Sequence, residues 1–341
     1  MDGEEPGCRE VESIARKNAP PEIPARLVRI PVSCAGRRLD QVLAELYPGF
    51  SRSRLAELVR EGRVRLSGRA ALPSRRVKAD ESLEVDFGEP LSRAPAGPEP
   101  MGLTVVWEDA DLIVVNKPAG LVVHPGAGHH GGTLLNGLLY RYPELDRVPR
   151  GGLVHRLDKD TSGLLVIARN EPAHTRLTRA IAAREVRRVY WALVLGEPTA
   201  GQKIEAPLGR DRRNRQRRAV VPSGKPADTT FRIRERFTGA CLIEASLGTG
   251  RTHQIRVHLA HVGYPLVGDP LYGGRSRSAR GMCAEVREAV RTFSRQALHA
   301  QSLSFRHPGT REPCEWEAPL PQDLEDLLGL IRAAEAGVHH A

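Results

Sequence analysis

Charged and polar side chains crowd residues 155–162, just before a short apolar stretch, LLVIAR, that is predicted to be a buried strand. Polar groups beside a buried strand often point into a cleft. Asp158 lies among basic residues in this loop, and nearby cations favour an ionised carboxylate that could act as a nucleophile or a base. The loop equally suits a tight turn in which Asp160 and Ser162 bond the backbone. Spacing alone leaves both interpretations open.

Other kinds of catalytic site find little support in the sequence. His253 and His258 are five residues apart, which places them about 140° apart around a helix, and no HExxH motif occurs. Ser162 lacks the GxSxG elbow of a hydrolase. A nuclease or methyltransferase would need clustered metal carboxylates or a Gly-rich cofactor loop, and neither is found. The five scattered cysteines form no CxxC pair, which favours a reducing cytosol over a zinc ribbon or a disulfide framework.

Short apolar stretches are predicted to form the sheet that positions this loop. Helices are expected at about 172–183, across THQIRVHLAHVG (252–263) and at about 321–333. Strands outnumber helices and the connections are short, so we expect an α+β fold with a mixed, largely antiparallel sheet. The predicted strands are LTVVWE (103–108), DLIVVNK (111–117), LLVIAR (164–169), VYWALVLG (189–196), TTFRIRERF (229–237) and CLIEASL (241–247).

A smaller unit is predicted before these strands. Leu39, Leu43 and Leu46 share one helical face, a second helix carries Leu55 and Leu58, and two alternating stretches follow. No apolar run approaches the roughly 18 residues that a membrane helix needs, and the N-terminus does not resemble a signal peptide. The predicted division is a flexible N-terminus (1–26), a small domain (27–88), a Pro- and Gly-rich linker (89–102), a large domain (103–333) and a tail (334–341).

The net charge of +10 is concentrated in two places, the second helix with its following turn and the stretch RDRRNRQRR (210–218). A basic surplus favours a polyanionic partner, with RNA or DNA first. Arg suits this role because its guanidinium makes forked contacts to phosphate oxygens. The alternative for both segments is an ordinary solvated surface. The candidates for phosphate contacts are Arg52, Arg54, Arg63, Arg65, Arg212, Arg213 and Arg215.

The loop HRLDKDTSG (155–163) is very similar to the signature loop of the RluA-type pseudouridine synthases. Three longer segments resemble further parts of that family in the same order: NKPAGLVVHPG (116–126), RRVYWALVLG (187–196) and GTGRTHQIRVHLAHVGYPLVGDPLYGG (248–274). SRSRLAELVREGRVRLSGR (51–69) is similar to the alpha-L RNA-binding module, which often has Asn in place of Ser67. The resemblance covers roughly residues 30–333 and is nearest to the large-subunit ribosomal RNA branch of the family.

The resemblance implies roles for individual residues. Asp158 corresponds to the essential carboxylate, Arg256 to its ion-pair partner with Arg251 as the second choice, and Tyr190 to a Tyr that stacks on uracil and helps to remove its C5 proton. The family often has Lys where this chain has Arg188. The candidates for RNA contacts around this centre are His155, Arg156, Thr161, Arg251 and His253.

The implied reaction breaks the C1′–N1 bond of uridine, turns the base and rejoins it through C5, without a cofactor or a metal. The carboxylate could attack C1′ or remove the C2′ proton, and the sequence leaves both routes open. The target base must first be flipped out of its stack. The expected partner is ribosomal RNA or an assembling large subunit, in the cytoplasm, and nothing in the sequence requires more than a monomer.

The main rival is an RNA-binding or ribosome-assembly protein with a degenerate enzyme domain. The intact RLDKDTSG loop, Tyr190 and Arg256 argue against it.

Overall fold

The computed structural model describes residues 26–47, 52–86, 97–126, 131–211, 214, 216–273 and 281–338. The chain forms two compact units, residues 1–93 and 94–341, whose boundary falls inside the predicted linker. The finer division into five parts stays a prediction. In the described part of the chain, no helix is both long and apolar enough to cross a membrane.

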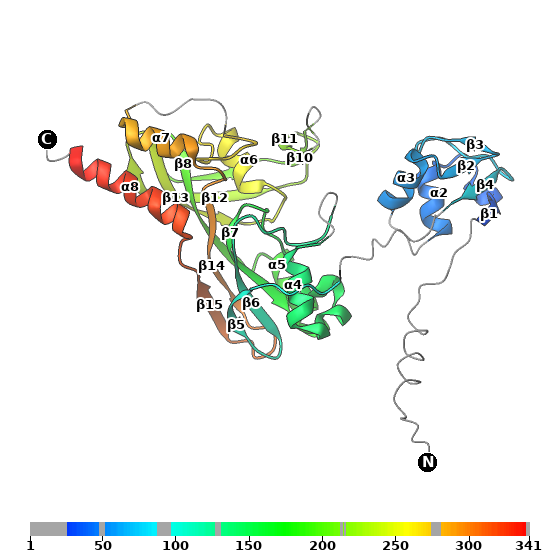
Figure 1. Cartoon of the computed structure of the whole chain (residues 1–341), viewed down its shortest axis with the longest axis horizontal. Helices are drawn as coiled ribbons and strands as arrows, with labels where there is room; N and C mark the ends of the chain where they lie inside the picture. Colours follow the sequence, from blue (N-terminus) through cyan, green and yellow to red (C-terminus); the bar gives the residue numbers. More distant parts are fainter. Residues whose placement is uncertain are drawn as a thin grey trace, which may run out of the picture. The chain divides into compact units, whose positions relative to one another are not determined.

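The first unit packs two short helices on a small antiparallel sheet (Figure 1). Leu39, Leu43 and Leu55 are fully buried, as their helical spacing predicts. Ser67 and Gly68 both have positive φ, the geometry of a two-residue hairpin turn, so Ser67 takes the left-handed conformation that Asn adopts readily. The sheet order is β1-β4-β2-β3, and the elements are β1 (Arg26–Arg29), η1 (Val32–Cys34), α2 (Leu39–Leu46), α3 (Arg52–Arg60), β2 (Val64–Leu66), β3 (Arg69–Ala70) and β4 (Ser82–Val85).

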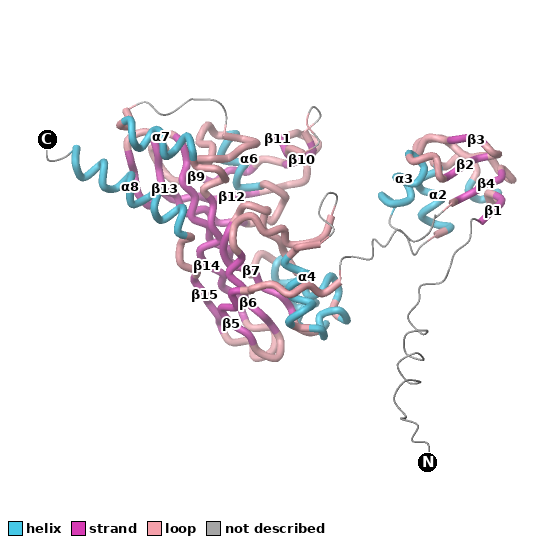
Figure 2. The backbone as a smooth tube through the Cα atoms, in the orientation of Figure 1, coloured by secondary structure: helices cyan, strands magenta, loops and turns pink. Residues whose placement is uncertain are grey.

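The second unit is built on a nine-stranded sheet (Figure 2). Its one parallel pair joins β7 to β14, and the other pairs among the described strands are antiparallel, so the predicted α+β fold with a mixed, mainly antiparallel sheet is confirmed. The order is β5 (Thr104–Glu108), β6 (Leu112–Lys117), β7 (Ser162–Ala168), β14 (Leu298–Arg306), β8 (Arg187–Leu195), β13 (Ala240–Leu247), β12 (Asp228–Phe237) and β9 (Gln202–Glu205), with β15 (Pro313–Glu317) paired to β14.

The central strand β8 sends alternate side chains to the two faces of the sheet. Tyr190, Ala192 and Val194 join the core cluster that also contains residues of α4 (Leu134–Arg141) and α6 (Gln254–His261). Leu193 points the other way, into the cluster under α7 (Ala284–Thr292) and α8 (Gln322–Val338). Helix α5 (Glu171–Ala182) covers the end of the sheet formed by β6 and β7. Tyr190 therefore faces the side on which α6 lies.

Several segments differ from the sequence expectation. Helix α8 continues to Val338 instead of ending near residue 333, so the first residues of the predicted tail are helical. The sequence patterns also missed α4, α7, β14, β15 and the small hairpin of β10 (Leu208–Arg210) and β11 (Arg218–Val220). Of the predicted tract 210–218, Arg210 ends β10 and Arg218 begins β11, while 212, 213 and 215 lie outside the described residues.

Candidate active site

A buried lysine, Lys117, forms hydrogen bonds that hold the loop carrying Asp158. Lys117, at the end of β6, donates from Nζ to the carbonyl oxygens of Pro118, Leu121 and Lys159 at 2.7, 2.9 and 2.9 Å. Its side chain is 1% exposed. Burial lowers the pKa of Lys117 to about 7, although Asp160 and Asp158 act in the opposite direction. The lysine thus ties the loop to the neighbouring strand.

Further contacts hold the loop from the side of β14. The Thr161 amide donates to the Asp158 carbonyl at 3.1 Å, and the Thr161 hydroxyl accepts from Gln296 Nε2 at 3.0 Å. Gly163 then lies so close to β14 that a Cβ atom would stand 2.3 Å from the Ala300 carbonyl oxygen. Only glycine permits this approach, which brings the start of β7 against β14.

Asp158 forms the ion pair that the resemblance implied. Arg256 NH1 lies 3.2 Å from Asp158 Oδ2, and Arg256 is 4% exposed. The other edge of the guanidinium is held by Asp269, which accepts from Arg256 Nε at 2.7 Å and NH2 at 2.8 Å. Burial opposes the charge on Arg256, but the hydrogen bonds and charge of Asp269 raise its pKa above the usual value. Arg256 is therefore a rigid donor aimed at Asp158.

A second contact to Asp158 comes from the start of α6. His253 takes a left-handed conformation (φ 58°), which places its Nε2 4.0 Å from Asp158 Oδ1. The Tyr272 hydroxyl accepts from the Arg218 amide at 2.7 Å and lies 2.9 Å from His253 Nδ1, so it can donate its own proton there. That arrangement puts the imidazole proton on Nε2, facing Asp158. Burial lowers the pKa of His253 more than Asp158 raises it.

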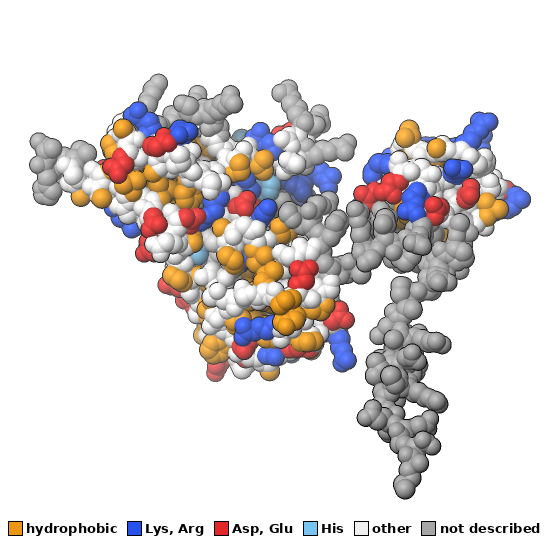
Figure 3. All heavy atoms as spheres, in the orientation of Figure 1, with side chains coloured by type: hydrophobic (Ala, Val, Ile, Leu, Met, Phe, Trp, Pro, Cys, Tyr) orange, Lys and Arg blue, Asp and Glu red, His pale blue; other side chains and the backbone are white. Residues whose placement is uncertain are grey.

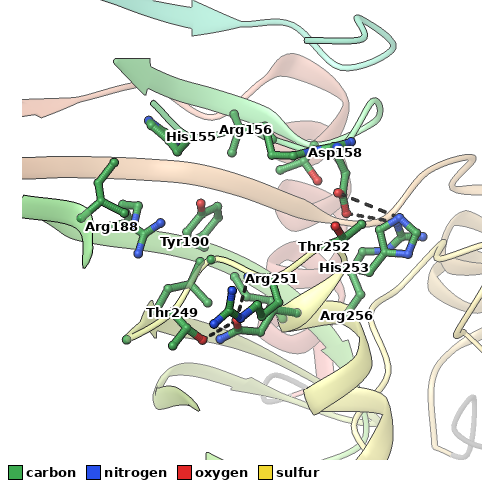
Figure 4. Close-up of a pocket in the computed structure, with 18 of the residues that line it drawn as sticks. His155, Arg156, Asp158, Arg188, Tyr190, Thr249, Arg251, Thr252, His253 and Arg256 are labelled. Atoms are coloured by element: carbon green, nitrogen blue, oxygen red, sulfur yellow. Dashed lines mark hydrogen bonds and ion pairs between the residues drawn. The ribbon is translucent and has the colours of Figure 1, made fainter. Parts of the chain in front are cut away.

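Asp158, Arg256 and His253 line one cavity of about 600 Å³ (Figure 4). Tyr190 contributes its ring from β8 and is 5% exposed, and burial raises the pKa of its phenol. Figure 4 shows Tyr190 between Arg188 and Asp158 in this view. The described residues contain no group of three or more His, Cys, Asp or Glu that could hold a metal ion.

The structure brings together every site residue that was predicted in the large domain and is described. They are His155, Arg156, Asp158, Thr161, Tyr190, Arg251, His253 and Arg256. Arg251, the second choice as ion-pair partner, donates from Nε to the Pro226 carbonyl at 3.4 Å. Sequence reasoning missed Lys117, Asp269 and Tyr272, although all three stand within segments quoted for the resemblance.

Among the residues predicted to contact phosphate, only Arg63 and Arg65 have described side chains. Arg63 pairs with Asp86 at 3.4 Å, and Arg65 is exposed on β2. The side chains of Arg52 and Arg54 and the whole of Arg212, Arg213 and Arg215 lie outside the described residues. Basic side chains gather beside α6 and the β10–β11 hairpin on the face drawn in Figure 3.

Comparisons with known proteins agree with this geometry. A family model described as RNA pseudouridylate synthase matches residues 111–261, and one described as S4 domain matches residues 37–83. The chain is 47% identical to a "Ribosomal large subunit pseudouridine synthase D" of Pseudomonas aeruginosa, over 90% of this chain and 96% of the relative. A protein of the same name from Xanthomonas campestris is also 47% identical, over 90% and 92%.

A solved structure shares the fold. "Human RNA Pseudouridylate Synthase Domain Containing 4" aligns with a TM-score of 0.53 at 23% identity, over 67% of this chain and 93% of that one. The chain belongs to the RNA pseudouridylate synthase family, whose members are isomerases that convert uridine in RNA to pseudouridine.

Proposed function

We propose that this pseudouridine synthase modifies uridines in large-subunit ribosomal RNA, with Asp158 as its catalytic carboxylate. The observation that carries the residue assignment is the ion pair of Asp158 with the buried Arg256 at the wall of the cavity. The choice of RNA rests on two relatives named ribosomal large subunit pseudouridine synthase D, which are 47% identical over nearly their whole length.

In this proposal Asp158 meets the sugar of a flipped uridine. Arg256 and His253 hold the carboxylate on two sides and leave it 15% exposed to the cavity, so that it can reach C1′ or the C2′ proton. A group that is pre-oriented in this way loses little freedom when the reaction begins. Asp269 contributes by fixing Arg256 and touches no substrate atom itself.

We assign Tyr190 to stacking against the uracil ring. The phenol lies in the cavity wall, and an aromatic ring is a suitable platform for a flipped base. Because burial raises the pKa of Tyr190, the phenolate that would accept the C5 proton is disfavoured near neutral pH. Removal of the C5 proton is therefore the less favoured of the two roles implied for this residue.

Flipping the base costs a few kcal/mol, which contacts to the RNA backbone must offset. We assign this role to Arg156, Arg251 and the Arg-rich stretch 210–218, together with the basic residues of the small unit. Arg156 and Arg251 are exposed at the mouth of the cavity. We further propose that the protein acts as a monomer in the cytoplasm, on free RNA or an assembling subunit.

The substrate assignment is tested by mapping pseudouridine after incubation with unmodified large-subunit ribosomal RNA and, separately, with transfer RNA. Sites are read by carbodiimide labelling and primer extension. The proposal expects modification at a small set of positions in the ribosomal RNA. Modification confined to transfer RNA would overturn the substrate assignment while leaving the family intact.

A further inference from the structure

Arg188 is a buried cation whose Nε has no acceptor among the described residues. It lies on β8, two residues before Tyr190, and is 5% exposed. In the described part of the chain its buried Nε atom has no hydrogen-bond partner, and no carboxylate there lies within ion-pair distance of its guanidinium. An isolated charge is costly to bury unless a partner compensates it. The missing acceptor is therefore expected to come from a ligand.

His155, which lines the same cavity, carries a second donor that has no partner among the described residues. Its Nε2 accepts from the Val166 amide at 3.1 Å, so the ring proton must stand on Nδ1. Nδ1 is buried and has no partner among the described residues. Burial, reinforced by the charge of Arg188, lowers the pKa of His155 to about 3. The imidazole is thus a neutral group whose Nδ1 can only donate.

Both residues line the cavity that holds Asp158 and Tyr190. Arg188 and Tyr190 are two residues apart on β8, so their side chains project from the same face of the strand, and Tyr190 lies between Arg188 and Asp158 in Figure 4. A uridine whose sugar meets Asp158 and whose base stacks on Tyr190 would extend its ring toward Arg188 and His155. Uracil carries two carbonyl oxygens on that ring, and these can accept hydrogen bonds from Arg188 and from His155 Nδ1.

We propose that Arg188 and His155 form a subsite for a uracil carbonyl oxygen and stabilise the uracil anion that is released when the C1′–N1 bond breaks. In that step the bonding electron pair leaves with the base and spreads from N1 onto O2 and O4. Asp158 compensates at the sugar, either by bonding to C1′ or by taking the C2′ proton.

The later steps need no co-reactant. The turned base bonds to C1′ through C5, while the Asp158 carboxylate either leaves C1′ or returns its proton to C2′. C5 then loses its proton and N1 gains one. Charge that develops on the leaving group meets donors already in place, which is the usual source of large electrostatic rate gains. This inference rests on the proposed function, and it assigns a role to the residue at which the chain departs from the family's frequent Lys.

The test compares Arg188→Met with the matched control Arg187→Met, whose side chain is exposed on the opposite face of the same strand. RNA labelled with tritium at uracil C5 is mixed with excess enzyme, so that single-turnover release is measured at saturation, and RNA affinity is measured separately. We expect Arg188→Met to slow release by about 100–1000-fold, the usual effect of removing one oxyanion donor. Arg187→Met should keep the wild-type rate, and Arg188→Lys should restore most of the lost rate.

A second readout separates anion stabilisation from a structural role. RNA that carries 5-fluorouridine has a better leaving group, because fluorine stabilises the uracil anion. Its consumption is followed by mass spectrometry of the digested nucleosides. The rate ratio of the fluorinated to the natural substrate should be larger for Arg188→Met and for His155→Phe than for the wild type. The ratio is taken within one protein, so partial unfolding does not change it.

The outcomes are distinct. An Arg188→Met rate equal to that of Arg187→Met, or an unchanged fluorine ratio, would overturn the inference. Loss of RNA affinity with a normal rate at saturation would make Arg188 a phosphate contact and would also overturn it. A wild-type protein that releases no tritium would instead contradict the proposed function.

Discussion

Asp269 is expected to be the strongest single stabiliser of the active site, and Asp269→Asn tests this. Its side chain is fully buried, and Oδ1 accepts from Arg256 NH2 and from the amides of Leu271 and Tyr272 at 2.8, 2.9 and 3.1 Å. Oδ2 accepts from Arg256 Nε at 2.7 Å. An Asn amide would face at least one N–H donor with its own NH₂ group. The substitution also removes a negative charge beside a guanidinium that is 5% exposed.

Breaking a buried ion pair on one side usually costs about 3–5 kcal/mol. For a domain of this size each kcal/mol lowers Tm by about 2–4 °C, so calorimetry should find the transition of the second unit lower by about 6 °C or more. The control is Glu235→Gln, which weakens a two-pronged pair with Arg332 whose side chains are 37% and 45% exposed. That surface pair is worth about 1 kcal/mol or less.

The single-turnover rate of Asp269→Asn should fall as well, because Arg256 would no longer be fixed against Asp158. Equal Tm values for Asp269→Asn and Glu235→Gln would refute the reasoning, since it would mean that the buried clamp contributes no more than an exposed pair.

Three further outcomes follow from the geometry. Lys117→Met should lower the free energy of unfolding and the rate, because three carbonyl oxygens lose their donor. The pKa of Lys117 falls from 10.5 to about 7 on folding. Between pH 7 and pH 10.5 the unfolded chain therefore binds more protons than the folded chain. The contribution of Lys117 to the free energy of unfolding rises with pH across that range. The gap between wild type and Lys117→Met in urea titrations should therefore widen from pH 7 to pH 9, and a gap that narrows would contradict the assignment. Tyr272→Phe leaves the Arg218 amide unpaired and should cost about 1–3 kcal/mol of stability, checked in the same titrations; a change near zero would show that the hydroxyl bonds are not formed. Deleting residues 1–88 should reduce the slope of log affinity against log salt by about 0.9 for each lost phosphate contact to duplex RNA, taking the value for B-DNA, and an unchanged slope would mean that the small unit does not touch phosphate.

Periodic apolar patterns were enough to predict the elements that carry the site. The short apolar runs of β7 and β8 gave the right strands, and the spacing of Ile255 and Leu259 gave α6. Local patterns could not join Asp158 to Arg256, because 98 residues separate them and neither position is marked by spacing. That pairing came from the resemblance.

The missed elements have a physical explanation. β14 mixes apolar residues with His299, Ser302 and Ser304, and the buried ring of His299 bonds the Ser162 hydroxyl at 2.9 Å and the Ala318 carbonyl at 3.3 Å. A polar residue that is buried through a tertiary partner looks exposed in the sequence. Asp269 was missed for the same reason, since its four donors come from α6 and from a turn that no periodicity marks.

The most direct test of the central claim is tritium release from large-subunit ribosomal RNA labelled at uracil C5, measured for the wild type and for Asp158→Asn. Pseudouridine formation must lose the C5 hydrogen, whereas binding alone leaves it in place. We expect stoichiometric release by the wild type, none by Asp158→Asn, and RNA affinities within a few-fold of each other. Release at the wild-type rate by a folded Asp158→Asn protein would contradict it.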